Sequence, residues 1–411
     1  ENSYFEQFPE AHTDSIWKEY YVFLNSIDNP ERFGKGSYSK LLPGQSSIRL
    51  NYKKVSLGLS TENLWWGPGI RNSLMMSDNA PGFAHITFNS TRPVKTFIGH
   101  FEWQIIGGRL KNSNILPSDT SRTYEDQVLY LPKQNSDRYI NAMVITWQPK
   151  WVKGLFLGFS RSFYQYSDNV PKNFNGYLPV FSTFFKGGTK DDYGIGRDQM
   201  LSLFFRWLLP KENAEVYFEF GRNDHSQNTT DLALEPEHSR AYIIGMKKLF
   251  KNARNKDVEI MMETANLQSP STSTIRALQP WYAHYQVRHG YTNMGQVLGA
   301  GTGPGSNSQT LGISWLNGVR KFGIVFERYV HNNDFYYLAF GPMHNYDSHW
   351  VDLSINATKS WVYKRFLVSG NLAMVRSLNY QWRYEGNPAT LLNGKKNVNN
   401  IQFALSTAYI F

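Results

Sequence analysis

The sequence predicts an all-β fold: a transmembrane antiparallel β-barrel of about eighteen strands, with short periplasmic turns and long extracellular loops. Three observations support this prediction. Polar and apolar residues alternate with a period of two over stretches of about ten residues, which is the length of a tilted strand across a bilayer. Aromatic residues make up 16% of the chain, although its mean hydropathy is −0.47. The last stretch alternates up to a terminal Phe411.

The composition excludes several other classes of protein. The chain has no continuous apolar run of about 18 residues, so a helical membrane protein is excluded. The net charge of +10 comes from scattered Lys and Arg, which does not indicate nucleic-acid binding. The absence of cysteine favours an oxidising compartment. Because no linker divides the chain, we expect a periplasmic segment over residues 1–17 and one barrel over residues 18–411.

Several segments show the alternation clearly. Residues 214–220 place acidic and tyrosine side chains on one face and apolar ones on the other. A soluble β-sandwich also alternates, but its strands are usually five or six residues long, and its apolar face is less aromatic. We therefore assign the polar faces to a lumen, lined by His100, Glu102, Gln104, Glu215, Tyr217, Glu219, His284, Gln286, Arg288, Glu327 and Asp352.

Inward-facing carboxylates have a structural explanation first. Cross-strand ion pairs form a ladder that stiffens a barrel. A selective channel would use the same residues, so both interpretations stay open. The acidic residues concerned include Glu215, Glu219, Glu259, Glu263 and Glu327, and their expected basic partners are Arg206, Lys247, Arg288 and Lys321.

In order along the chain, the predicted strands are 18–27, 45–53, 54–62, 82–91, 95–110, 137–148, 153–164, 198–209, 213–222, 238–250, 256–268, 281–290, 295–300, 309–316, 320–331, 346–357, 360–377 and 398–411. Asn-Gly favours tight hairpins and Pro ends strands. Because barrels of this class keep short turns in the periplasm, we expect both termini there. The predicted tight connections are Lys53-Lys54, Arg92-Pro93, Pro149-Lys150, Pro210-Lys211, residues 252–255, Thr292-Asn293, Asn317-Gly318 and Lys359.

The final predicted strand indicates which membrane the protein occupies. It places Ile401, Phe403, Leu405 and Tyr409 on the same face as Phe411. A last strand that ends on Phe, with Tyr two residues earlier, resembles the C-terminal signature of bacterial outer-membrane barrels. We therefore predict an integral protein of the outer membrane of a Gram-negative bacterium.

The stretch LWWGPG, residues 64–69, sets two tryptophans beside a corner that Gly-Pro-Gly makes sharp. In the predicted topology it opens the second outer loop, at the mouth of the barrel. Trp65 and Trp66 can stack on the faces of sugar rings, or they can pack inward and brace the barrel wall. Both interpretations stay open.

The longer segment Ser60 to Phe83 resembles the capsule assembly protein Wzi family. Members carry a WWGPG-type motif followed by a Ser-Leu-x-x-Ser-x-Asn-Ala-Pro-like run. A second segment, His289 to Ser308, is similar to the family's Gly-Tyr-x-x-x-Gly-x-x-x-Gly stretch. The residues that match the first motif are Trp65, Trp66, Gly67, Pro68, Gly69, Ser73, Leu74, Ser77, Asn79, Ala80 and Pro81.

This resemblance implies an outer-membrane barrel of eighteen strands with a periplasmic helical region. It also implies binding of high-molecular-weight capsular polysaccharide and help in attaching that polymer to the cell surface. Residues 1–17 are too few for the helical region, which we expect to be missing or reduced.

No enzyme motif stands out, since the sequence has neither Gly-x-Ser-x-Gly nor His-Glu-x-x-His. We expect no catalytic residue, no metal and no cofactor. An acidic polysaccharide would need cations and aromatic or amide groups on the outer loops. The candidates are Trp65, Trp66, Arg71, Lys111, Arg122, Tyr124, Lys133, Lys172, Lys190, Tyr193, Arg383 and Lys395.

We therefore predict a non-enzymatic, lectin-like outer-membrane protein that binds capsular polysaccharide or exopolysaccharide. A diffusion channel for sugars or other solutes is the first alternative, and a structural subunit of a larger outer-membrane complex is the second. The expected partners are surface polysaccharide, lipopolysaccharide, outer-membrane lipid and proteins of the periplasm or outer membrane, but not nucleic acid.

Overall fold

One large antiparallel sheet dominates the computed structural model, which describes residues 12–30, 33, 39–182, 196–223, 229–252, 256–274, 276, 278–344, 348–382 and 397–409. Its strands pair in the order β1-β2-β3-β5-β8-β9-β10-β11-β12-β13-β16-β17-β18-β19-β20, and β4 also pairs with the first residues of β5. The bounds are β1 Ser47–Tyr52, β2 Val55–Ser60, β3 His85–Ser90, β4 Val94–Thr96, β5 Gly99–Leu110, β8 Arg138–Pro149, β9 Leu155–Tyr166, β10 Arg197–Leu209, β11 Ala214–Asn223, β12 Arg240–Phe250, β13 Asp257–Asn266, β16 Asn307–Asn317, β17 Arg320–Val330, β18 Val351–Tyr363, β19 Phe366–Leu378 and β20 Val398–Tyr409.

The remaining elements lie in the connections between these strands. Two short hairpins join β6 (Thr123–Tyr124) to β7 (Gln127–Val128) and β14 (Thr292–Asn293) to β15 (Gln296–Val297). Among the described residues, the α-helices are α1 (Asp14–Leu24), α2 (Phe174–Tyr177), α4 (Thr229–Leu234) and α5 (Asn333–Phe340). Within the described ranges, none of the helices is both long and apolar enough to cross a bilayer.

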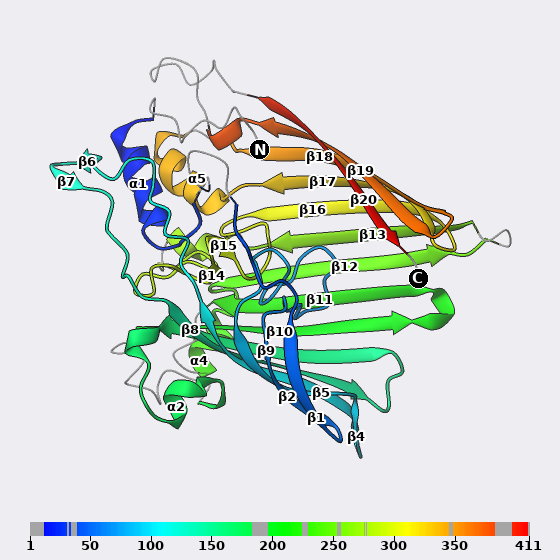
Figure 1. Cartoon of the computed structure of the whole chain (residues 1–411). Coiled ribbons are helices and arrows are strands. Elements are labelled where there is room, and N and C mark those ends of the chain that lie inside the picture. Colours follow the sequence, from blue (N-terminus) through cyan, green and yellow to red (C-terminus); the bar gives the residue numbers. More distant parts are fainter. Residues whose placement is uncertain are drawn as a thin grey trace.

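Tight turns and long connections lie at opposite ends of the sheet (Figure 1). The predicted hairpins at Lys53-Lys54 and Asn317-Gly318 are present, and positive φ angles of 52° at Lys53 and 58° at Gly318 close them. Turns also follow Pro149 and Leu209, as predicted. The predicted turn at 252–255 lies partly outside the described residues. This arrangement of short and long connections confirms the predicted fold class.

The strands carry polar side chains inside and apolar side chains outside. In β10, Ser202 is fully buried, whereas its neighbour Leu203 is 54% exposed. In β11, Glu219 is fully buried, while in β12 the apolar side chain of Ile244 is exposed. A surface that exposes apolar side chains while carboxylates are buried is the arrangement expected of a wall in contact with lipid.

Residues 18–27 do not form the predicted strand, because most of them belong to helix α1. Ile16, Trp17, Tyr20 and Tyr21 recur at helical spacing and are buried on one side of α1, where they pack against α5. The sheet therefore begins only at β1. The helix lies at the end of the sheet that carries the long connections, opposite the end at which β20 finishes. The terminal residues lie outside the described residues, so the predicted side of the two termini stays a prediction.

Two more predicted strands are wrong. Residues 281–290 form no strand, and residues 295–300 contribute only β15 of a separate hairpin. Tyr282 and Gly290 have φ angles of 69° and 65°, which interrupt extended backbone. In this segment Trp281, Tyr282 and Ala283 are buried by protein rather than exposed to lipid.

Three predicted turns are also misplaced. Arg92-Pro93 separates β3 from β4, and the turn follows at residues 97–98. Lys359 lies inside β18, which turns into β19 only at residues 364–365, and Thr292-Asn293 is β14 itself. In the described part of the chain the sheet has sixteen strands, with β4 included, rather than eighteen.

Candidate functional site

Two connections fold into the interior of the sheet, and we call residues 61–84 and 278–306 together the plug. Both segments belong to one buried apolar cluster that also contains inward-facing residues of the wall. The buried apolar side chains of the plug in this cluster are Leu64, Trp66, Leu74, Met75, Met76, Ala80, Phe83, Trp281, Tyr282, Ala283, Val287, Tyr291, Val297, Leu298 and Ala300. The plug therefore has an apolar core of its own, continuous with the wall.

Hydrogen bonds join the two segments of the plug directly. The backbone N–H of Ser77 donates to the carbonyl of Leu298 (2.8 Å), and the Ser77 hydroxyl donates to the carbonyl of Gly299 (2.5 Å). The Tyr282 hydroxyl donates to the carbonyl of Leu74 (2.9 Å). These contacts bring together the two sequence motifs on which the family resemblance rests.

A wall carboxylate, that of Glu263 on β13, fixes the corner of the first segment. Its Oε2 atom accepts from the backbone N–H groups of Ile70 (2.7 Å) and Arg71 (3.0 Å). It also accepts from the Tyr217 hydroxyl (2.8 Å), while Oε1 accepts from Nδ2 of Asn72 (3.1 Å). Hydrogen bonds to a charged acceptor are stronger than neutral ones, so Glu263 is a firm anchor.

A second wall carboxylate, that of Glu219 on β11, holds the next turn. It accepts from the Leu74 N–H (3.1 Å) and from the Ser202 hydroxyl (2.9 Å). Gly67 lies against it with φ of 155°, and a Cβ atom at Gly67 would lie 2.7 Å from the Glu219 Oε2 atom. The first glycine of the Gly-Pro-Gly corner therefore allows the loop to reach this carboxylate.

The two tryptophans of the corner have different environments. Trp66 is only 3% exposed, and its indole N–H donates to Oε1 of Gln104 on β5 (2.9 Å). Trp65 is 37% exposed, and its indole N–H donates to the carbonyl of Gly69 (3.1 Å). Trp66 thus braces the wall, while Trp65 keeps a ring face at the surface.

Trp65 lines a polar cavity of about 330 Å³ beside the plug. The Arg71 guanidinium forms an ion pair with Glu327 (3.1 Å), and the Tyr329 hydroxyl donates to the carbonyl of Thr302 (2.5 Å). The cavity is lined by Trp65, Arg71, Asn72, Ser77, Asp78, Asn79, Gly301, Thr302, Glu327 and Tyr329. An aromatic ring, a guanidinium and several amide, hydroxyl and carboxylate groups can bind a polyhydroxyl ligand by stacking and hydrogen bonds.

The second segment of the plug contains a buried histidine, His289. The Tyr166 hydroxyl and Nδ1 of His289 are 3.0 Å apart. Burial, followed by the charges of Arg138, Lys133 and Arg288, lowers the pKa of His289 to about 3. His289 is therefore neutral at physiological pH.

Three of the predicted polysaccharide-binding residues contact helix α1. The Arg122 guanidinium lies 3.9 Å from the centre of a ring of α1, that of Trp17. Tyr124 lies under the ammonium of Lys18, and Lys133 donates to the last carbonyl of α1 (2.6 Å). Burial lowers the pKa of Lys133 to about 8.

The structure describes two of the remaining predicted binding residues, Lys111 and Lys172, and neither lines the cavity. Lys111 has an exposed side chain, and its backbone N–H donates to Oδ1 of Asn293 in the plug (2.9 Å). Lys172 is exposed next to α2. Lys190, Tyr193, Arg383 and Lys395 lie outside the described residues.

The predicted lumen residues differ in what they contact. Gln104, Tyr217, Glu219 and Glu327 lie on inward faces, where each contacts the plug or the carboxylate that anchors it. Glu215 instead forms the predicted ladder, at 2.5 Å from Arg206 and 3.6 Å from Lys247, and Lys247 continues it to Glu259. Asp352 contacts His331 (2.9 Å) in the connection after β17.

The remaining predicted lumen residues lie closer to the tight turns or within the plug itself. His100 and Glu102 share the face of Gln104, closer to the tight turns. His284, Gln286 and Arg288 are not on a strand, because residues 281–290 belong to the plug. The Arg288 guanidinium donates to the carbonyl of Asn25 (3.1 Å) and so ties the plug to the end of α1.

Some cavity residues were missed by the sequence analysis. Asp78 lies inside the recognised motif and could have been found from its neighbour Asn79. Tyr329 shares an inward face with Glu327. The sequence gives no sign that Thr302 lies beside it and that the two residues line one cavity. No group of three or more potential metal ligands occurs among the residues that the structure describes.

The fold and the cavity define a class of protein: a barrel-like antiparallel sheet whose own connections fill its interior. A search of curated proteins found no match. The chain belongs to the capsule assembly protein Wzi family, whose family model matches residues 31–385.

A solved structure supports this fold. The chain is similar to Wzi of Escherichia coli, described as an outer membrane protein involved in group 1 capsule assembly and as a carbohydrate-binding β-barrel. The TM-score is 0.62 at 14% sequence identity, over 89% of this chain and 70% of that chain. The fold class predicted from the sequence is confirmed, and so is the family resemblance.

Proposed function

We propose that this chain is an outer-membrane protein that binds surface polysaccharide without transforming it and helps to hold the polymer at the cell surface. The observation that carries the proposal is the cavity at Trp65 and Arg71, built from both motif segments. Family membership and the carbohydrate binding of the E. coli protein support it. The long connections would face outward and the tight turns the periplasm, as in other barrels of this kind.

The cavity has the chemistry that a sugar needs. The exposed ring of Trp65 offers an apolar face for the C–H groups of a pyranose ring, and Asp78 and Asn79 offer hydrogen bonds to its hydroxyl groups. The Arg71 guanidinium offers a cation for the carboxylate of an acidic sugar. A volume of about 330 Å³ is at the lower end for ligand pockets, which suits one or two sugar units of a longer chain.

A small cavity implies a weak contact with each segment of polymer. Retention of the whole polymer would then come from many copies of the protein that bind many repeats of the same chain. This suits a protein that holds a surface layer rather than one that captures a single free sugar.

The test is binding of purified full-length protein to oligosaccharide fragments of the host's own capsule or exopolysaccharide. Trp65→Ala should weaken binding by about tenfold, because aromatic contacts dominate such interfaces. Trp151→Ala is the matched control, since Trp151 is 63% exposed in a tight turn at the other end of the sheet. Equal binding by wild type and Trp65→Ala would contradict the proposed site.

A second variant tests the kind of polymer. Arg71→Gln should weaken binding of acidic fragments and leave neutral fragments unaffected, because only the former engage the guanidinium by charge. Arg109→Gln is its control, as Arg109 also forms an exposed ion pair, with Asp137 at 2.6 Å. If Arg71→Gln weakened binding of both kinds of fragment equally, a role for Arg71 in recognising the carboxylate would be excluded.

A further inference from the structure

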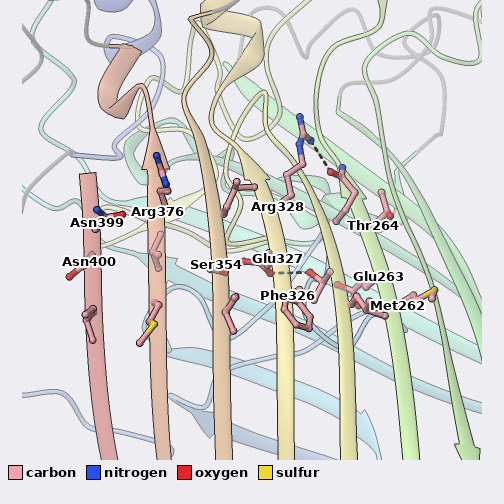
Figure 2. A pocket seen from close by; sticks show the side chains of 18 residues that line it. Met262, Glu263, Thr264, Phe326, Glu327, Arg328, Ser354, Arg376, Asn399 and Asn400 are labelled. Carbon is pink, nitrogen blue, oxygen red and sulfur yellow. Dashed lines mark hydrogen bonds between the residues drawn. The ribbon is translucent and has the colours of Figure 1, made fainter. Parts of the chain in front are cut away.

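A second and larger cavity, of about 890 Å³, lies on the wall formed by β13 and β16 to β20 (Figure 2). Most of its lining side chains alternate with the inward-facing Glu263 and Glu327, so they belong to the outer face of the sheet. This cavity is therefore separate from the polar cavity of the plug.

The lower part of the cavity is an apolar row. Strand register places six of its residues directly opposite one another across neighbouring strands: Met262, Leu311, Phe326, Ile355, Met374 and Ile401. Met262, Phe326, Ile355, Met374 and Ile401 are each more than a third exposed. Such a row belongs to the part of the wall that contacts acyl chains.

The upper part of the cavity is a polar, cationic row, two residues closer to the long connections. Figure 2 shows Arg328, Arg376 and Asn399 above the level of Phe326. Along the strands, this polar row lies about 7 Å from the apolar row. In register, its polar members are Thr264, Gln309, Arg328, Arg376 and Asn399, and the apolar Leu353 lies between the two arginines.

The two arginines have charges that no acidic side chain balances in the described part of the chain. Nη1 of Arg328 donates to neutral amide oxygens, those of Asn307 (3.2 Å) and Gln309 (2.8 Å). Arg376 is exposed on the same face, two strands away, and forms no ion pair with a described residue. Adjacent strands lie about 4.8 Å apart, so the Cα atoms of the two arginines are about 10 Å apart. Their long side chains can therefore reach the same ligand.

We propose that this outer-wall cavity binds a phosphorylated glycolipid of the outer leaflet, of the lipid A type. Its phosphate groups lie between Arg328 and Arg376, where guanidinium groups bind phosphate by two parallel hydrogen bonds. Its acyl chains cover Phe326, Ile355 and Met374. This inference rests on the proposed outer-membrane location and on the outward orientation of the long connections.

The combination of the two rows favours a lipid over other anions. A polysaccharide or a soluble phosphate would gain nothing from a row of exposed Met, Ile and Phe side chains in the membrane. A zwitterionic lipid with one phosphate would leave one of the two arginines without a partner. A lipid with separated phosphates and several acyl chains fits both rows.

The experiment is native mass spectrometry of the full chain in detergent with added lipid A. Arg328→Gln/Arg376→Gln should bind diphosphorylated lipid A at least about tenfold more weakly than wild type. Arg365→Gln, in the tight turn between β18 and β19, is the matched control and should bind as wild type. Wild type should also bind dephosphorylated lipid A about tenfold more weakly.

Two results would overturn the proposal. One is equal lipid A binding by wild type and the double variant, when both show the same heat-unfolding midpoint. The other is equal binding of phosphorylated and dephosphorylated lipid by wild type.

Polysaccharide binding separates this inference from the proposed function. The double variant should retain the capsular fragments as wild type does, and Trp65→Ala should retain lipid A. If lipid binding failed while polysaccharide binding persisted, only the lipid site would be wrong.

Discussion

At the scale of single residues, the Trp65-Trp66 pair divides two roles that the sequence left as alternatives. Trp66 points into the wall and bonds to Gln104, whereas Trp65 caps the corner through Gly69 and faces the cavity. Adjacent residues in an extended segment point to opposite sides, which is why one stretch can serve both purposes. Structure and proposed binding are therefore separable by mutation.

Trp66→Ala should destabilise the protein by about 3 to 5 kcal/mol, because it removes a large buried ring and leaves a cavity. Trp65→Ala should cost about 1 kcal/mol or less, because that ring is partly exposed. The heat-unfolding midpoint of detergent-purified protein measures both. An equal fall of the unfolding midpoint in the two variants would show that Trp65 and Trp66 contribute equally to stability, which would contradict the division of roles.

His289 gives a pH dependence of stability whose sign follows from its environment. Its pKa is about 3 in the folded protein and 6.5 ordinarily, so the unfolded chain binds more protons between these values. Its stabilising contribution is complete above about pH 6.5 and is lost as the pH falls toward 3. Unfolding midpoints of wild type and His289→Gln, measured from pH 7 to pH 4, should therefore converge on acidification.

The exposed His344, changed to Gln, serves as the control for His289. Its unfolding midpoint should stay parallel to that of wild type over the same pH range. A constant gap between wild type and His289→Gln would mean that this side chain is not desolvated by the plug.

The sequence predicted the faces of these side chains better than their partners. The alternation correctly put Glu215, Glu219 and Glu263 inside. It could not tell that Glu215 pairs along the wall while Glu219 and Glu263 bind the backbone of a loop. An alternation with period two shows which face of a strand a residue occupies. It does not show the partners of that residue inside the barrel, because those come from segments far away in the sequence.

At the scale of elements, tight turns were predictable where local chemistry determines them. Asn317-Gly318 and Pro210 act within a few residues, and the turns lie there. The segments 18–27 and 281–290 were mistaken for strands, because aromatic side chains buried against protein resemble those exposed to lipid. The helical spacing of Trp17, Tyr20 and Tyr21 was the available signal for α1.

The first segment of the plug should depend on the Glu263 anchor. Glu263→Ala removes the acceptor of four hydrogen bonds, so residues 69–72 should open more often and trypsin should cleave after Arg71 at least about tenfold faster. Limited digestion followed by mass spectrometry of the fragments measures this rate.

Glu259→Ala is the control for Glu263→Ala, because Glu259 pairs only with Lys247 and Lys321 of the wall in the described structure. It should leave cleavage after Arg71 at the wild-type rate. If cleavage after Arg71 became equally faster in both variants, general loosening of the wall, rather than loss of the Glu263 hydrogen bonds, would explain the opening of residues 69–72.

At the scale of the whole molecule, the plug bears on the choice between a binding protein and a diffusion channel. Its apolar core joins inward residues of the wall, such as Tyr217 and Ile140. An open aqueous path through the middle of this cluster would require the plug to move. The filled interior therefore favours the binding function over the channel that the alternating faces also allowed.

Planar-bilayer recordings should give no steady ohmic current for the wild type. Glu219→Ala/Glu263→Ala, which removes both wall anchors, should produce frequent transient openings. A steady wild-type current that the double variant leaves unchanged would support the channel instead.

The number of strands shows the limit of prediction at this scale. Alternation identified nearly every strand of the sheet, from β1 to β20, but three stretches counted as strands lie outside it. The sequence predicted only part of the candidate cavity. Trp65 and Arg71 were named as binding residues, whereas Tyr329 and Thr302 line the cavity only because the fold brings distant segments together. Such contacts leave no local period in the sequence.

The interlocking of the two plug segments has a consequence for how such proteins diverge. Ser77 and Gly299 meet across 222 positions of the chain, and a side chain at Gly299 would collide with the carbonyl of Leu74. Loops that take no part in this contact can change without disturbing it. We therefore expect the two segments of the plug to be compatible only as a matched pair, so a chimaera that exchanges one of them with that of a distant relative should fold poorly.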